Sequence, residues 1–100
     1  TGAKRISSLP DVPTMKELYG EDLFVQEAWG GLWAPAGTPA AVVRRFNEEM
    51  NKALKSPEVI ERLRKSYAFA EGGSPEEFTK FLADEGARWT KLVKDRNIKM

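Results

Sequence analysis

The sequence contains neither cysteine nor histidine, and these two absences remove much of the usual catalytic chemistry. Without them the chain has no thiolate nucleophile, no imidazole base, no disulfide and none of the common zinc-binding sets. An excess of one charge is also lacking, because 16 lysines and arginines stand against 15 aspartates and glutamates, which gives a formal net charge of +1. We therefore do not expect the broad basic surface of a nucleic-acid or anionic-membrane binder.

Long hydrophobic runs are missing as well. No stretch approaches the roughly 18 apolar residues that a membrane-spanning helix needs, and the chain starts at Thr1 without methionine or a hydrophobic leader. Its 100 residues, of which 41% are hydrophobic, are enough for one modest domain or for a piece of a larger protein. We therefore expect a soluble chain whose start is cut from something longer.

The first part of the chain predicts a loop followed by a short helix. Residues 1–13 contain two prolines and little periodicity, which is typical of a connection. Thr14 and Glu17 have the spacing of a capping box, in which a hydroxyl and a carboxylate each accept a hydrogen bond from a backbone amide at the start of a helix. Gly20 suits the C-terminal stop of that helix.

Two segments predict strands. The segment from Leu23 to Ala34 is rich in aromatic and branched residues, which favour strands. Its central Gly30 and Gly31 indicate a bulge, a bend, or the close approach of another backbone or a ligand. A briefer strand is expected from Ala68 to Ala70. With the helices, these segments predict an α/β fold with a small sheet and three to four helices.

Three further helices are predicted by one repeated pattern, a hydroxyl residue followed by proline. The hydroxyl can cap free amide groups, and proline fits the first helical position because its missing N–H would be unpaired there. The pairs are Thr38-Pro39, Ser56-Pro57 and Ser74-Pro75. We expect helices from Pro39 to Lys55, from Pro57 to about Tyr67, and from Pro75 to about Asn97. The last is the longest, and one side of it carries Phe78, Phe81, Leu82, Trp89, Leu92 and Val93.

Two acidic residues are candidates for a site, and each also has a plainer interpretation. Glu85 lies on the apolar stripe of the last helix, where a carboxylate is costly unless it is paired. It is either a ligand-binding or catalytic group, or the partner of a basic side chain or backbone amide. Glu27 shares a strand face with Trp29, so it either points into a site or lies on a half-wet face. An enzyme that uses either carboxylate is disfavoured, because no histidine, cysteine or metal cluster accompanies them.

Other patterns are weaker still. The loop from Ala34 to Pro39 leads into a helix start whose amides could hold an anion. It lacks the lysine and the glycine spacing of a phosphate loop, so an ordinary turn is the alternative. The basic residues Arg62, Arg64 and Lys65 have acidic neighbours and indicate a solvated helix face.

Several segments together resemble one family. They are Leu9-Pro10-Asp11-Val12-Pro13-Thr14, the run from Trp29 to Pro39, Ser56-Pro57-Glu58-Val59, Gly73-Ser74-Pro75-Glu76-Glu77-Phe78, and Glu85 with Arg88-Trp89. In this order they are similar to the C-terminal part of Bug/TctC-type extracytoplasmic solute-binding receptors of tripartite tricarboxylate transporters, over essentially the whole chain. One departure is that the family usually has a glycine after the second helix, where this chain has Ser66-Tyr67.

The resemblance implies a fold, a function and partners. Residues 1–100 would be a single segment equivalent to the C-terminal third of a two-domain receptor with a type II periplasmic-binding-protein-like α/β architecture. The parent, exported by a signal peptide, would bind a small carboxylate in the periplasm and deliver it to membrane permease subunits. It would need no catalysis, cofactor, metal or nucleic acid. Glu27, Trp29 and Gly30 are the candidates for lining the ligand cleft. The alternative is a non-binding structural or interaction module that self-associates, as a homodimer of the fragment.

Overall fold

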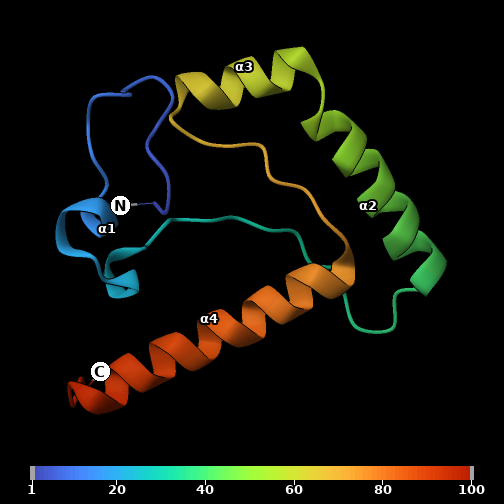
Figure 1. Ribbon diagram of the computed structural model, residues 1–100. Coiled ribbons are helices and arrows are strands. Elements are labelled where there is room, and N and C mark those ends of the chain that lie inside the picture. Colours follow the sequence, from blue (N-terminus) through green and yellow to red (C-terminus); the bar gives the residue numbers. More distant parts are fainter. Residues whose placement is uncertain (1, 100) are drawn as a thin grey trace. The chain divides into compact units, whose positions relative to one another are not determined.

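The computed structural model describes residues 2–99, apart from the side chain of Leu23. Figure 1 shows helices joined by extended connections. No β-strand occurs between residues 2 and 99. The predicted α/β fold with a small sheet is therefore wrong for the described chain. The chain divides into two compact units, one that ends at Trp33 and one that begins at Ala34.

Both predicted strands are wrong for the same physical reason. Residues 25–34 and residues 68–74 form neither helix nor strand. Aromatic and branched residues favour a pleated conformation, but a strand forms only where its N–H and C=O groups pair with a neighbouring strand. Residues 2–99 supply neither segment with such a partner. The start of the longer predicted strand forms instead the short 3-10 helix η1 (Asp22–Phe24).

The N-terminal unit contains α1 (Met15–Tyr19), followed by η1. The predicted capping box at the start of α1 is confirmed. The backbone N–H of Thr14 donates to Oε2 of Glu17 at 3.0 Å, and the N–H of Glu17 donates to Oγ1 of Thr14 at 3.1 Å. The predicted stop is confirmed too, because Gly20 follows α1 with a φ of 72°, in the left-handed region that favours glycine.

The C-terminal unit consists of α2 (Ala40–Leu54), α3 (Pro57–Lys65) and α4 (Pro75–Asp95), which Figure 1 labels. Helix α2 makes limited contact with α3 and with α4. The proline starts of α3 and α4 are confirmed. A second capping box begins α4, in which the N–H of Glu77 donates to Oγ of Ser74 at 3.1 Å.

The hydroxyl caps expected for α2 and α3 are wrong. The N-cap of α2 is Pro39, and Oγ1 of Thr38 donates instead to the carbonyl oxygen of Pro35 at 2.8 Å. Ser56 is the N-cap of α3, but its side chain makes no capping hydrogen bond. The loop before α2 is therefore closed as a turn by the hydrogen bond of Thr38. Helix α3 begins at Pro57 without a side-chain cap.

A tyrosine occupies the left-handed position after α3. Tyr67 has a φ of 54°. Its N–H donates to the carbonyl oxygen of Arg64 at 3.0 Å, and the N–H of Ala68 donates to that of Leu63 at 2.9 Å. These two bonds make a Schellman motif, whose left-handed residue is usually glycine. Tyr67 therefore stands at a left-handed position where the glycine usual in the family would be unstrained.

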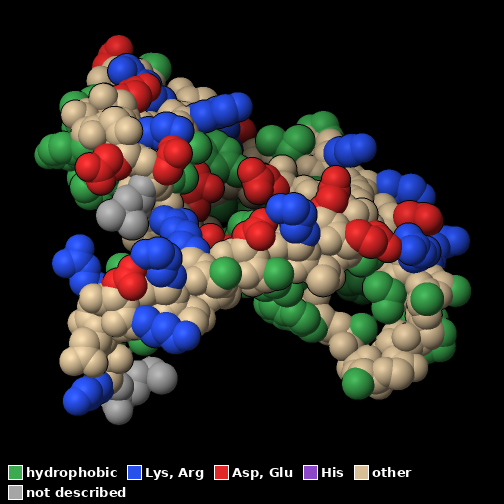
Figure 2. All heavy atoms as spheres, turned by 60° about the horizontal axis from the view of Figure 1, so that its bottom comes forward, with side chains coloured by type: hydrophobic (Ala, Val, Ile, Leu, Met, Phe, Trp, Pro, Cys, Tyr) green, Lys and Arg blue, Asp and Glu red, His purple; other side chains and the backbone are tan. Residues whose placement is uncertain are grey.

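The described residues bury very little apolar surface. Among the described side chains only Thr14 is buried, with 7% of its surface exposed, and no hydrophobic one is. Figure 2 shows hydrophobic side chains at the surface between charged ones. The large exposed hydrophobic residues include Leu32, Trp33, Phe46, Tyr67 and Phe69. Hydrophobic burial is the main force in folding, so these units have little of that stabilisation by themselves. No helix among residues 2–99 is long and apolar enough to cross a membrane.

Candidate functional site

The three residues predicted for a ligand cleft lie on the irregular segment at the end of the N-terminal unit. The rings of Trp29 and Trp33 have centroids 6.3 Å apart and are inclined by 51°. Trp29 is 44% exposed. The carboxylate of Glu27 lies against Gly2, where a side chain would collide with it. Nothing in the described chain lies within 4 Å of the position that a Cβ on Gly30 would take, so no other backbone approaches it closely.

The segment presents the carboxylate of Glu27, the indole ring of Trp29 and, at Gly30, a backbone without a side chain. An indole ring can cover the apolar part of a ligand, and the carboxylate of Glu27 can accept a hydrogen bond from a hydroxyl group. Neither Glu27, Trp29 nor Gly30 carries a positive charge. A carboxylate ligand would therefore need hydrogen-bond donors from elsewhere, either cationic side chains or backbone N–H groups, because like charges repel and charge-assisted hydrogen bonds are the strong ones.

A hollow of about 250 Å³ lies in the same unit, among residues of the loop before α1. Its lining is mostly apolar and includes Ile6, Leu9 and Val12, but two cationic residues, Lys4 and Arg5, also line it. The sequence analysis did not single out this hollow, because an irregular loop gives no periodic signal. The adjacent pair of basic residues at its start is the one feature of the sequence that could have drawn attention to it.

Three hydrogen bonds fix Arg5 in place. Its Nε donates to both carboxylate oxygens of Glu17, at 2.8 and 3.1 Å, and its Nη1 donates to the carbonyl oxygen of Pro10 at 2.9 Å. The backbone N–H of Thr14, and then Arg5, lower the pKa of Glu17 below its ordinary value. Glu17 thus both caps α1 and anchors the loop that lines the hollow.

Of the two roles predicted for Glu85, the structure shows the structural one, in which its carboxylate is paired within α4. Its Oε2 accepts a hydrogen bond from Nε1 of Trp89 at 3.0 Å, and its Oε1 lies 3.5 Å from Nη1 of Arg88. The guanidinium carbon of Arg88 lies 5.9 Å from the centre of the Trp89 ring, within range of a cation–π interaction. The prediction that Glu85 pairs with a basic side chain is confirmed, and the pairing explains a carboxylate on this stripe.

Two asparagines of α2 bind the backbone of the segment before α4. Nδ2 of Asn47 and Nδ2 of Asn51 donate to the carbonyl oxygen of Gly73, at 2.9 and 2.8 Å. In return, the N–H of Gly73 donates to Oδ1 of Asn51 at 3.0 Å. We call this set the amide clamp. Sequence analysis missed it, and the only available signal was the spacing of four residues, which places both asparagines on one helix face.

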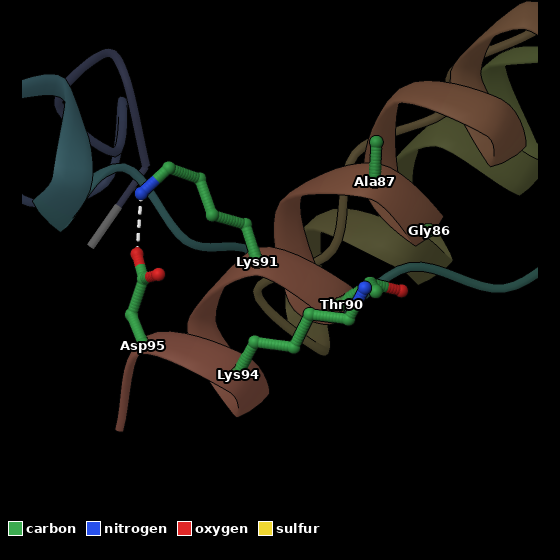
Figure 3. A pocket seen from close by; sticks show the side chains of 6 residues that line it. All are labelled: Gly86, Ala87, Thr90, Lys91, Lys94 and Asp95. Carbon is green, nitrogen blue, oxygen red and sulfur yellow. Dashed lines mark hydrogen bonds and ion pairs between the residues drawn. The ribbon is translucent and has the colours of Figure 1, made fainter. Parts of the chain in front are cut away.

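Basic residues elsewhere form surface ion pairs. Arg64 pairs with Glu61 at 2.9 Å, in agreement with a solvated face on α3. A shallow depression along α4 is lined by residues of this one helix, among them Lys91 and Lys94, and Lys91 pairs with Asp95 (Figure 3). A depression on a single helix has no opposing wall to hold a ligand. No cluster of acidic side chains in the described part of the chain could hold a metal ion.

Comparison with known proteins gives one consistent result. The model of the tripartite tricarboxylate transporter family receptor matches residues 1–98. The chain is 41% identical over 93 residues to a Pseudomonas sp. (strain P51) protein named "UPF0065 protein in tcbD-tcbE intergenic region", and 34% identical over 96 residues to "Protein BugT" of Bordetella pertussis. These matches cover 93% and 96% of this chain but only 28% and 29% of the two relatives. No solved structure matches the chain.

Proposed function

The chain belongs to the tripartite tricarboxylate transporter receptor family, a family of solute-binding receptors rather than of enzymes, and from this premise we propose that its parent protein binds a small carboxylate. In this proposal residues 1–100 are the C-terminal third of a two-domain receptor. The receptor works in the periplasm and hands its ligand to membrane permease subunits. The ligand contacts both domains and stabilises their closed arrangement.

The exposure of apolar side chains is the observation that carries this proposal. Soluble monomers rarely expose large contiguous apolar patches unless something binds there, yet no hydrophobic residue whose side chain is described is buried. The two relatives extend well beyond the part that matches this chain. We infer that the rest of the parent covers these apolar faces, and that the ligand is held between this segment and that remainder.

Glu27, Trp29 and Gly30 are the proposed lining of the cleft from this side. Their segment is irregular and largely exposed, so a ligand can reach it. Trp29 would cover the carbon skeleton, and the bare backbone of Gly30 would allow close approach. Glu27 would accept a hydrogen bond from a hydroxyl group of the ligand.

A self-associating module that binds no ligand is the second candidate. The apolar side of α4 favours it, because Phe81 and Trp89 are 39% and 40% exposed there. A second copy could cover that side in place of the rest of the parent. The two candidates differ in what they require, since only the receptor needs the full-length protein to bind a carboxylate.

Calorimetry on the full-length parent with succinate, malate and citrate tests the proposal. At least one of these should bind, and Trp29→Ala should weaken that binding by about tenfold if the ring covers the ligand. Leu32→Ala, which shortens another exposed apolar side chain of the same segment, is the matched control and should leave binding unchanged. A parent that binds none of the three, together with dimers of the isolated chain, would favour the module. Fractionation of cells that express the parent tests its location.

A further inference from the structure

The end of α3 combines backbone strain with an exposed aromatic ring. Tyr67 follows this helix with a φ of 54°, a conformation that is strained for any residue with a side chain. Its side chain is 66% exposed, and within residues 2–99 it forms no hydrogen bond and no ring contact that would offset the strain. Strained residues cluster where proteins bind other molecules. Tyr67 is therefore a candidate for a contact with another molecule.

Two unpaired cations lie in the last turn of the same helix. This turn contains Arg62, Arg64 and Lys65. Arg64 pairs with Glu61 at 2.9 Å. Arg62 and Lys65 are exposed, and no carboxylate among residues 2–99 forms an ion pair with either of them. Burying an unpaired charge is costly. Unlike the apolar faces, this end of α3 should therefore stay at the surface of the parent.

We propose that Arg62, Lys65 and Tyr67, which we call the α3 patch, form a surface by which the parent docks on an acidic segment of its membrane permease subunits. The inference rests on the proposed function, because the receptor has to contact the permease to hand over its ligand. Carboxylates of the partner pair with Arg62 and Lys65, and an apolar side chain covers the ring of Tyr67. Tyrosine and arginine are among the residues that most often dominate the binding energy of protein interfaces.

The composition of the α3 patch favours a protein partner over a lipid surface. Anionic membranes attract clusters of about four to eight basic residues, whereas this patch has two, and the exposed carboxylate of Glu58 lies one helical turn before Arg62. A protein segment can instead place single carboxylates opposite single cations. A second copy of the chain is disfavoured too, because a symmetric contact would bring the same cations together.

Binding of the full-length parent to its permease subunits in nanodiscs of zwitterionic phosphatidylcholine tests the α3 patch. Tyr67→Gly should weaken this docking at least about tenfold, as expected for a dominant interface tyrosine. The same substitution should raise the melting temperature of the parent, because it relieves the strain at a φ of 54°. Affinity for whichever of succinate, malate and citrate the parent binds should not change. Tyr67→Phe keeps the ring and should dock almost normally.

Matched controls separate the patch from general effects of strain and charge. Asn97 has a φ of 48° after α4, so Asn97→Gly relieves strain outside the patch and should leave docking unchanged. Arg62→Gln should weaken docking about threefold or more, and a rise in salt concentration should weaken docking of the unaltered parent. Arg45→Gln removes the same charge from the same unit, but Arg45 lies on α2 and pairs with Glu49 at 3.3 Å, so docking should not change.

The outcomes distinguish the docking surface from the function on which it rests. If the parent binds a carboxylate and its permease, but Tyr67→Gly docks as tightly as the unaltered parent, the patch is wrong and the receptor function stands. Equal losses in Arg62→Gln and Arg45→Gln would mean that only the net charge matters, and they would also refute the patch. A parent that binds neither a carboxylate nor the permease overturns both.

Two further results would assign the ring of Tyr67 to another neighbour. A lower melting temperature of Tyr67→Gly would mean that the ring packs against the rest of the parent, and the docking surface would be wrong. Binding to empty nanodiscs of phosphatidylglycerol, with the same loss in Tyr67→Gly, would assign the patch to a lipid surface and refute the protein partner.

Discussion

Replacing Asn51 with alanine should release the segment before α4 from α2. The substitution removes both hydrogen bonds of Asn51 to Gly73, the one it donates to the carbonyl oxygen at 2.8 Å and the one it accepts from the N–H at 3.0 Å. It also removes the bond that Nδ2 of Asn51 donates to Oδ1 of Asn47 at 3.2 Å, which does not involve Gly73. Asn47 still donates to the same carbonyl oxygen at 2.9 Å, so that oxygen keeps a partner. The N–H of Gly73 loses the partner that the clamp provides.

The size of the effect follows from these contacts. A hydrogen bond within a protein contributes about 1 kcal/mol net, so losing the two that hold Gly73 should lower the free energy of local opening at Gly73 by roughly 2 kcal/mol. Since 1.4 kcal/mol corresponds to a factor of ten, the N–H of Gly73 should exchange with solvent about 30-fold faster in Asn51→Ala than in the unaltered receptor. Asn47→Ala removes its bond to Gly73 but leaves the N–H of Gly73 paired, so its effect on this amide should be smaller.

Native-state hydrogen exchange of the Gly73 amide measures this directly, and Asn51→Asp sharpens the test. Aspartate still accepts from the Gly73 N–H, but its ionised carboxylate would face the Gly73 carbonyl oxygen and repel it. That contact should raise the pKa of Asp at this position. Its stabilising form is therefore protonated, present at low pH and lost as the pH rises through the raised pKa. Exchange that is less than threefold faster in Asn51→Ala, or Asn51→Asp as protected as Asn51 at pH 7, would refute the clamp.

Four other outcomes are expected. Ser74→Ala should destabilise the receptor by about 1 kcal/mol, whereas Ser56→Ala should cost only a few tenths, because only Ser74 makes a capping hydrogen bond; equal shifts in thermal unfolding would contradict this. Glu17 should titrate below 4.5, so that its contacts with Thr14 and Arg5 persist above that pH and are lost as the pH falls through its lowered pKa; an NMR titration checks the value. Tyr67→Gly should stabilise the receptor by about 1 kcal/mol, because glycine adopts a φ of 54° without strain; an unchanged or lower melting temperature speaks against it. The isolated 100-residue chain should self-associate and bind succinate or citrate weakly at most; sedimentation as a monomer at every concentration would disprove the first part, and tight binding in calorimetry the second.

Helix ends could be predicted from the sequence because the interactions that define them are local. The capping boxes at Thr14 and Ser74 and the stop at Gly20 each depend on residues at most four positions apart. The predicted sheet is wrong because strand pairing depends on a partner that residues 2–99 do not provide, and the composition of a segment does not reveal whether such a partner exists. A hydroxyl residue before proline did not predict the cap of α2, because the hydroxyl of Thr38 donates to the carbonyl oxygen of Pro35 in the preceding turn and not to the helix.

The same distinction between contacts of near neighbours and contacts of distant residues applies to the candidate sites. The pairing of Glu85 with Arg88 could be predicted because the two residues are one helical turn apart. The bonds of Arg5 to Glu17 and of Asn51 to Gly73 could not, because they join residues 12 and 22 positions apart across irregular segments. Patterns of periodicity and spacing describe regular elements, whereas these contacts depend on the path of loops.

Helix ends that are fixed by near neighbours lead us to expect that the helices of this chain form before their apolar faces are covered. The caps and stops of α1, α3 and α4 join residues at most five apart, so these helices need no distant segment to begin or end. A helix of the length of α4, which has 21 residues, forms on the order of a microsecond. The apolar faces of these helices remain exposed until other segments arrive, so docking of these faces is the slow step of assembly. During that interval the exposed apolar surface makes aggregation compete with folding.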